Sequence, residues 1–411
     1  METQSLSLDI ISSLPQNIIE TILTLMPLRD ALRTNILSKR WRYCWMTMPK
    51  LVFDHNLVRA KSGSQLKYKL VNAIFHVLLI HRGPRTLKFK LDVNKLGFKT
   101  EFHQIILSLS SKINVKDLII DNTSDTFYKL PTSFFLIQRL ESLELMNCEF
   151  ELPVTFTGFN KLRNMHFKNV RVSAQVLQHF LSNCPLLEEI ILGGYEEEYV
   201  EENYFKFVQL FQHVPLVHTL DISKYYMKYL AAGGMPNKLP TSLHLKDVGL
   251  DVCLSEQDVI SSILCIIRSS PNLEQLFFLM YDNEKLPIQE SSLMFVDLQD
   301  DLSLTLDRLT YFEIVGFSNM PLEMEFLKLI LETPAQQPLQ TEHPSHESTG
   351  ETSPTTPTSP SATIPMAQDE SSPESTPGRV KKLTEAAGFC VVVPARHAPL
   401  CYSLVEFNKL T

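Results

Sequence analysis

The sequence that decides the fold reads NCPLLEEIIL at residues 183–192. Leu187, Ile190 and Leu192 follow Pro185 with the spacing L-x-x-L-x-L. Proline cannot continue a helix and favours extended backbone around itself, so it stops an apolar helical stretch and turns the chain into a strand. The stretch therefore predicts one unit made of a helix, a proline break and a buried strand.

The same apolar triplet recurs along the chain, with starts 22 to 36 residues apart. With tolerated apolar swaps, the other matches are Val115/Leu118/Ile120, Leu140/Leu143/Leu145, Leu162/Met165/Phe167, Val217/Leu220/Ile222, the incomplete Leu243/Leu245, Leu273/Leu276/Phe278 and Leu309/Phe312/Ile314. Prolines lead into three of these strands, and residues 259–267 form a typical preceding helix. No unit can bury its apolar face alone, so the pattern predicts an irregular leucine-rich-repeat solenoid: a curved parallel sheet with helices outside.

A different pattern occupies the N-terminus. Leu14 and Pro15 open a helix whose apolar face carries Ile18 and Ile22 at fourfold spacing, and Pro27 ends it. A short second helix is expected to follow through residues 31–32. These features predict a small helical module before the repeats.

The only two tryptophans of the protein, Trp41 and Trp45, are expected one turn apart on a third helix that Ser38 caps. They could simply fill the core of the module. A unit of roughly 40 residues seldom buries so much apolar surface by itself, however, so surplus surface around Leu14, Pro15 and Trp41 predicts a partner.

The stretches DIISSLP at residues 9–15 and LSKRWR at residues 37–42, followed by Trp45, resemble the F-box over about residues 6–54. The resemblance implies binding to the Skp adaptor of an SCF ubiquitin ligase, and through it to cullin. Carried over by position, the adaptor-binding residues are expected to be Leu14, Pro15, Ile18, Ile22, Leu37, Ser38, Trp41 and, partly in the core, Trp45.

The body resembles the plant F-box, FBD and leucine-rich-repeat proteins, because LTYFEIVGF at residues 309–317 and EMEFLKLIL at residues 323–331 match the opening of the FBD region. We expect a helical connector at 55–83, the solenoid at 84–308 and the start of a truncated FBD at 309–334. A tract rich in Pro, Ser and Thr at 335–378 is expected to be a disordered linker, since it cannot bury enough apolar surface to offset chain entropy.

The divergent tail, residues 379–411, becomes apolar again. It could pair with the last strand, act as a docking peptide, or be unrelated sequence appended by an altered transcript. Five Ser or Thr residues of the linker region precede proline and could be phosphorylated, although most such pairs are plain solvated linker.

Bulk properties narrow the function classes. The net charge of -8 argues against binding to duplex nucleic acid, which needs a basic face. Seven widely spaced cysteines without a C-x-x-C pair suit free thiols in the nucleus or cytoplasm, and no apolar run approaches the length of a membrane span. The acidic run at 196–202 is expected to be a solvated loop, with contact to a basic target as the alternative.

Catalytic motifs and metal-ligand spacings are missing, so we expect no catalytic residues, no metal and no cofactor. His213 and His218, for example, are five residues apart, which is not a metal-ligand spacing. The sequence thus predicts a non-catalytic substrate-recognition adaptor that binds an unknown protein target through its repeats. The alternative is a non-degradative repeat scaffold or decoy with an impaired target-binding end.

Overall fold

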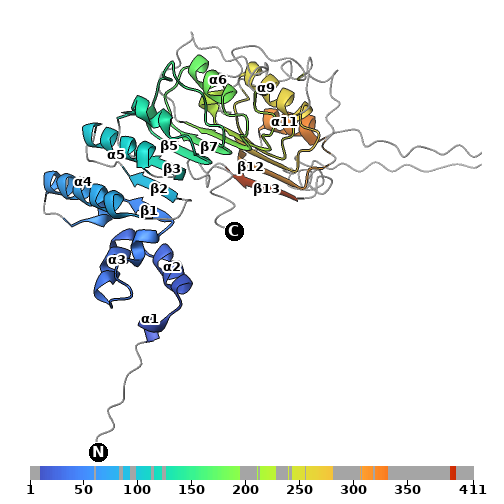
Figure 1. The fold of residues 1–411 in the computed structure, drawn as a ribbon. Coiled ribbons are helices and arrows are strands. Elements are labelled where there is room, and N and C mark those ends of the chain that lie inside the picture. The colour runs from blue at the N-terminus through green and yellow to red at the C-terminus, as the bar shows by residue number, and fades with distance from the viewer. Residues whose placement is uncertain are drawn as a thin grey trace, which may run out of the picture.

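In a computed structural model of the chain, a small helical module lies beneath one end of a long curved sheet, and further helices cover one face of that sheet (Figure 1). The structure describes residues 10–59, 62–82, 87–92, 99–112, 115–122, 126–194, 211, 213–227, 239, 243–254, 256–280, 306, 308–317, 320–331 and 389–394. The predicted α/β class, with an N-terminal helical module and a parallel repeat sheet, is confirmed.

The N-terminal module contains α1 (Ile10–Ser13), α2 (Gln16–Leu25) and α3 (Leu28–Arg33). Prolines stand at both predicted boundaries, where Pro15 precedes α2 and Pro27 separates α2 from α3. Each proline carbonyl accepts N–H groups of the first helical turn. The fixed φ of proline therefore sets where these two helices begin.

The predicted third helix is wrong in its geometry. Residues 39–43 form turns, and a 3-10 helix, η2 (Cys44–Thr47), replaces the expected α-helix. Ser38 does accept the N–H of Trp41, at 3.4 Å, as a capping residue would. Tyr43 then adopts a left-handed φ of 71°, which ends regular helical geometry at once. Two shorter 3-10 segments are η1 (Thr34–Ile36) and η3 (His55–Leu57).

Eleven described strands form one parallel sheet in chain order. They are β1 (Lys50–Phe53), β2 (Leu87–Asp92), β3 (Val115–Asp121), β5 (Ser142–Met146), β7 (Asn164–Lys168), β8 (Glu189–Gly193), β9 (Thr219–Ile222), β10 (Asp247–Val252), β11 (Gln275–Met280), β12 (Tyr311–Phe317) and β13 (Phe389–Pro394). A separate two-stranded ladder joins β4 (Tyr128–Lys129) to β6 (Cys148–Glu149). The sheet already starts at β1, inside the region that resembles the F-box.

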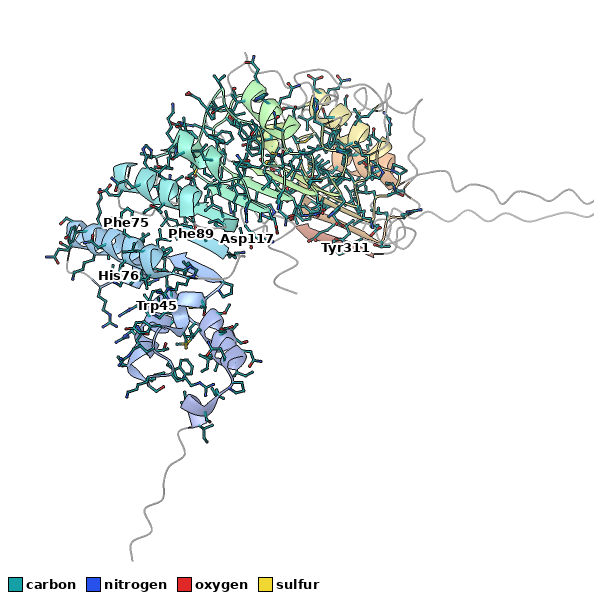
Figure 2. All side chains as sticks on the ribbon, viewed as in Figure 1. Trp45, Phe75, His76, Phe89, Asp117 and Tyr311 are labelled. Carbon is teal, nitrogen blue, oxygen red and sulfur yellow. The ribbon has the colours of Figure 1, made fainter. Side chains whose placement is uncertain are left out.

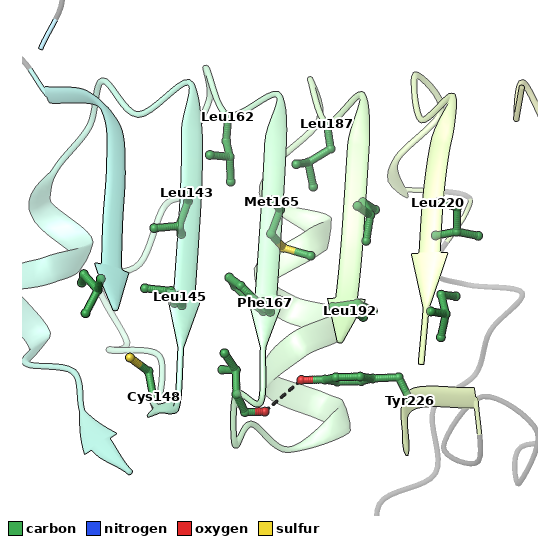
Figure 3. Packing of buried hydrophobic residues seen from close by; sticks show 14 of the residues in the cluster. Leu143, Leu145, Cys148, Leu162, Met165, Phe167, Leu187, Leu192, Leu220 and Tyr226 are labelled. Atoms are coloured by element: carbon green, nitrogen blue, oxygen red, sulfur yellow. Dashed lines mark hydrogen bonds between the residues drawn. The ribbon is translucent and has the colours of Figure 1, made fainter. Parts of the chain in front are cut away.

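The repeat triplets occupy equivalent buried positions of neighbouring strands. Figure 3 shows this stacking for Leu143, Leu145, Met165, Phe167, Leu192 and Leu220. One register is corrected: Leu243 and Leu245 precede β10, and its triplet is Leu245, Val248 and Leu250, with Val248 opposite Leu220. A pair of leucines two residues apart resembles a strand by itself, but the neighbouring strand fixes the register.

Helices lie on one face of the sheet (Figure 1). They are α4 (Gly63–Ile80), α5 (Lys99–Lys112), α6 (Ala174–Ser182), α9 (Gln257–Arg268) and α11 (Pro321–Leu331). The predicted helix at 259–267 lies within α9. Between β3 and β5 a 3-10 helix, η4 (Thr132–Leu136), fills the same layer. Seven phenylalanines from η4, from α6 and from the chain between them pack together, namely Phe134, Phe135, Phe150, Phe156, Phe159, Phe167 and Phe180.

Asparagines connect successive repeats just beyond the strands. Asn147 and Asn169 adopt left-handed φ values of 49° and 52°, which asparagine tolerates better than most residues. The Nδ2 of Asn147 donates to the carbonyl of Asn122 at 2.6 Å, and the Nδ2 of Asn169 donates to Oδ1 of Asn147. In the next repeats Tyr226 donates its hydroxyl to the carbonyl of Val170 (Figure 3). These bonds satisfy carbonyls that the turns leave unpaired.

The C-terminal strand resolves one open alternative. β13, from the divergent tail, pairs in parallel with β12, so the tail supplies the strand that the repeat rhythm demands after α11. The register shifts at Gly316, whose φ is +83° and whose added Cβ would lie 2.3 Å from the carbonyl oxygen of Met280. The predicted disordered linker at 335–378 and the acidic run at 196–202 lie outside the described residues. The domain boundaries stay predictions.

Candidate functional site

The N-terminal module exposes large apolar side chains. On α2, Ile18 is 41% and Leu25 82% exposed, and beyond α3 Ile36 and Leu37 are 87% and 55% exposed. Figure 1 shows α1, α2 and α3 at the end of the molecule, away from the repeat helices. Apolar side chains gathered on one small module typically mark an interaction surface. We call Ile18, Leu25, Ile36 and Leu37 the apolar F-box surface.

Six of the eight predicted contact residues, all except the two tryptophans, fall into two groups. Pro15, Ile18 and Leu37 are exposed, whereas Leu14, Ile22 and Ser38 are partly buried. Leu14 and Ile22 pack against the core of the module while keeping one side accessible. The first group can therefore touch a partner directly. The second group can contribute its accessible side.

Both tryptophans lie inside the module. Trp41 and Trp45 are 2% and 3% exposed, and the Nε1 of Trp41 donates to the carbonyl of Ile11 at 3.2 Å. The Nε1 of Trp45 has no hydrogen-bond partner. The surplus apolar surface expected around Trp41 thus lies at Ile36 and Leu37 instead. Direct contact of the two indoles with an adaptor stays a prediction.

Sequence reasoning missed Leu25 and Ile36. A usable signal existed for Ile36, because Ile36 and Leu37 are adjacent, and one short turn rarely buries two adjacent large side chains. Leu25 had no comparable local signal, since it ends α2 beside Met26, which is only partly buried. Its exposure follows from how α2 packs on η2 and α3.

Hydrogen bonds fix the module to the sheet. The N–H of Arg82 donates to the carbonyl of Met46 at 2.8 Å, and the N–H of Lys88 donates to the carbonyl of Pro49 at 2.8 Å. His81 Nε2 lies 2.9 Å from the carbonyl oxygen of Met48. Burial lowers the pKa of His81, while this hydrogen bond opposes the shift. With β1 already paired to β2, the apolar F-box surface is held in a fixed position relative to the repeats.

The face of the sheet opposite the helices carries the alternate side chains of each strand. Figure 2 labels two of them, Asp117 on β3 and Tyr311 on β12, on this side of the sheet. An ion pair joins neighbouring strands here, with 3.0 Å between Lys90 Nζ and Asp121 Oδ2, and His166 Nε2 lies 3.2 Å from Glu189 Oε2. We call this side the concave face. It is polar and half-exposed over β3, β5 and β7.

Charged residues also alternate along the edge where the strands begin. Lys116 pairs with Glu141 at 2.6 Å, Arg163 with Glu188, and Lys246 with Glu274 at 3.0 Å. Along this row the backbone N–H of Glu141, Arg163, Glu188 and Glu274 donates to the carbonyl of the residue at the same place in the preceding repeat, and the N–H of Lys246 donates to that of His218. These pairs are partly solvated and contribute little stability each, but opposite charges side by side favour the observed register.

Nucleophilic or metal chemistry finds little support in the described residues. The five cysteines whose side chains are described are buried, and burial raises the pKa of Cys148, Cys184 and Cys265 above the usual thiol range. A buried thiol with a raised pKa is a poor nucleophile. In that part of the chain no three His, Cys, Asp or Glu side chains gather as a metal site. None of its helices is long and apolar enough to cross a bilayer.

Comparison with known proteins matches the F-box domain to residues 11–53 and the LRR repeats of FBD-associated F-box protein At5g56370 to residues 104–213. Among individual relatives from Arabidopsis thaliana, F-box/FBD/LRR-repeat protein At1g13570 is 29% identical over 79% of this chain and 88% of its own length. The probable FBD-associated F-box protein At1g32375 is 27% identical over 45% of the chain. FBD-associated F-box protein At4g10400 is 29% identical over 45%. The chain spans less than half the length of these last two relatives.

Proposed function

We propose that this chain, which belongs to the F-box and LRR-repeat proteins of the FBD-associated group, is the substrate-recognition adaptor of an SCF-type ubiquitin ligase. Proteins of this kind are typically non-catalytic adaptors. The F-box would bind the Skp adaptor and through it cullin, and the repeats would bind a target protein. The observation that carries the proposal is the apolar F-box surface, held rigidly on a repeat sheet.

Burial of the apolar F-box surface would contribute a free energy of the size that adaptor binding needs. Fully burying one Leu or Ile side chain contributes about 1.5–3 kcal/mol. Ile18, Leu25, Ile36 and Leu37 keep between 41% and 87% of their surface exposed in the free chain. Covering these four side chains would therefore contribute several kcal/mol, enough to offset part of the entropy lost on association.

Co-purification with a plant Skp adaptor tests the docking half of the proposal. We expect Ile18→Asp with Leu37→Asp to reduce recovered adaptor at least tenfold, because truncating interface anchors typically costs about 2 kcal/mol each. Leu136→Asp is the matched control, since Leu136 on η4 is 55% exposed, like Leu37, but lies in the repeat body. Equal recovery from the double variant and the control would remove the main support for an adaptor role.

Leu14→Ala with Pro15→Ala tests the predicted Leu-Pro start of α2 separately. We expect it to weaken adaptor binding, because Pro15 sets the beginning of the helix that presents Ile18. Thermal unfolding of the same variant distinguishes a lost contact from a lost fold. Full adaptor binding by a folded double variant would exclude this turn from the interface.

Target delivery needs its own test. In a reconstituted ligase we expect adaptor-dependent transfer of ubiquitin to a partner captured by the repeats, and the proposed site of action is the nucleus or cytoplasm. A scaffold or decoy would bind that partner without transfer. The pairing of β13 with β12 continues the sheet beyond β12, which favours a complete target-binding end over an impaired one. Localisation is checked with a fluorescent fusion of the full chain.

A further inference from the structure

Tyr43 combines a strained backbone with an exposed aromatic ring. It lies in the turn before η2 with a φ of 71° and a ψ of 4°, in the left-handed region, and it is 58% exposed. In the described part of the chain the other two non-glycine residues with a positive φ are Asn147 and Asn169. Asparagine tolerates this region, whereas bulky residues rarely adopt it. Asparagine or glycine in this turn would therefore fold at a lower cost in free energy than tyrosine.

Hydrogen bonds on both sides hold the backbone of Tyr43 in this conformation. Its N–H donates to Oδ1 of Asn35 at 2.9 Å, and its carbonyl accepts the N–H of Met46 at 2.9 Å. Trp41 and Trp45, which flank it two residues away on either side, are buried. The neighbouring residues thus impose the left-handed φ, while the ring of Tyr43 does not offset the strain by its own burial. Strain that the surroundings impose on an exposed side chain points to a function for that side chain.

The hydrogen bond to Asn35 places Tyr43 beside the apolar F-box surface. Asn35 directly precedes Ile36 and Leu37, which are 87% and 55% exposed and belong to that surface. Because the bond joins residues eight apart in the sequence, the turn that carries Ile36 and the turn that carries Tyr43 lie side by side. Three large exposed side chains are therefore neighbours on the N-terminal module.

We propose that Tyr43 is a further contact residue for the Skp-type adaptor, and that Asn35 is the residue that positions it. The inference rests on the proposed function, because Tyr43 extends the surface that would dock the adaptor. A tyrosine ring suits this role, since it supplies a large, stiff contact area with one polar end, and tyrosine often dominates binding at protein interfaces. The residues that carry the F-box resemblance do not include Tyr43, so the resemblance alone does not assign this contact.

Tyr43→Gly separates binding from folding, because glycine removes the ring and also relieves the strain of a positive φ. We expect the dissociation constant of the full chain for a purified plant Skp adaptor, measured by biolayer interferometry, to rise at least about fivefold. The thermal unfolding midpoint should stay equal or rise by up to about 3 °C. Tyr43→Phe keeps the ring and should leave the dissociation constant within about twofold. Tyr68→Asn is the matched control, because it removes a tyrosine that is 71% exposed on α4, outside the apolar F-box surface, and it should also stay within about twofold.

A double-mutant cycle tests the positioning role of Asn35. Asn35→Ala removes the acceptor of the Tyr43 N–H, so the ring loses its fixed place and the dissociation constant should rise at least about threefold. The same change in the Tyr43→Gly background should have little further effect, because no ring is left to position. A purely structural role of Asn35 predicts equal effects in both backgrounds, and that result would contradict the positioning role.

An unchanged dissociation constant for the Tyr43→Gly chain would overturn the inference, and so would equal losses of affinity in Tyr43→Gly and Tyr68→Asn. A lower unfolding midpoint of Tyr43→Gly, or its failure to fold, would also contradict the inference, because the ring would then serve the fold. The two proposals fail separately. An unmodified chain that does not bind the adaptor contradicts the proposed function, whereas equal binding by the unmodified chain and by Tyr43→Gly contradicts this inference alone.

Discussion

Asp251→Asn is predicted to stabilise the protein near neutral pH. Burial raises the pKa of Asp251 to about 6, although a hydrogen bond from the Lys224 N–H and the charge of Lys224 both lower it. An unfolded aspartate has a pKa of about 3.9, so the folded state binds this proton more tightly. The stability that this carboxyl contributes is therefore fully present below about pH 3.9 and is lost as pH rises through about 6.

The magnitude follows from the same two pKa values. A difference of about two units corresponds to about 3 kcal/mol lost by pH 7.5. The asparagine carboxamide avoids the buried charge and can still accept the Lys224 N–H. Its own NH₂ group lacks the partner it needs, however, and this reduces the gain in unfolding free energy by about 1 kcal/mol. We therefore expect the variant to be more stable than the unmodified chain by about 1–2 kcal/mol at pH 7.5.

Urea unfolding of both proteins at a series of pH values provides the assay. The gain should shrink as pH falls below about 6 and disappear near pH 4.5, where the aspartate is largely protonated in the folded state. Asp258→Asn, on the exposed first turn of α9, should instead cost about 0.5 kcal/mol through the helix dipole. A destabilised Asp251→Asn protein at pH 7.5, or a gain that does not depend on pH, would refute the reasoning.

Three further predictions concern the repeat sheet. Gly316→Ala should lower the free energy of unfolding by more than about 1 kcal/mol, because the φ of Gly316 is +83° and the new Cβ would meet the Met280 carbonyl. Gly63→Ala is the control: a Cβ there has nothing within 4 Å, so urea unfolding should give a change within about 0.5 kcal/mol. Phe180→Ala should cost about 3–5 kcal/mol by opening a cavity among the phenylalanines, while Leu136→Ala at an exposed site should cost less than about 1 kcal/mol. Deleting residues 389–411 should lower the thermal unfolding midpoint and cause self-association that light scattering detects, because the edge of β12 loses its partner strand. Deleting residues 395–411 alone should do neither. Equal behaviour of the two truncated proteins would contradict the capping role of β13.

Much of the fold follows from local pattern. The L-x-x-L-x-L spacing places Leu187, Ile190 and Leu192 correctly because strand alternation is a property of the backbone itself. The misplaced Leu243/Leu245 strand shows the limit, because register depends on the neighbouring strands and not on the leucines alone. Pairing of β13 with β12 joins segments more than 70 residues apart, which no local signal reports.

In the candidate sites, too, features set by local sequence were predictable and features set by contacts distant in sequence were not. The start of α2 after Pro15 and the place of Ile18 on that helix were predictable, because proline and helical periodicity act locally. Their contact with an adaptor stays a prediction. For Trp41 the spacing left burial and exposure both open, and the hydrogen bond from its Nε1 to the carbonyl of Ile11, thirty residues earlier, has no local signal. The left-handed φ of Tyr43 and its hydrogen bond to Asn35 likewise have no signal in the spacing.

The most direct test of the central claim is hydrogen–deuterium exchange of the full chain with and without a plant Skp adaptor. The proposed docking predicts protection of α2 (Gln16–Leu25) and of residues 34–38, which carry the apolar F-box surface, while exchange over β7–β9 stays unchanged. Protection confined to the repeat sheet, or no protection of α2 at saturating adaptor, would contradict it.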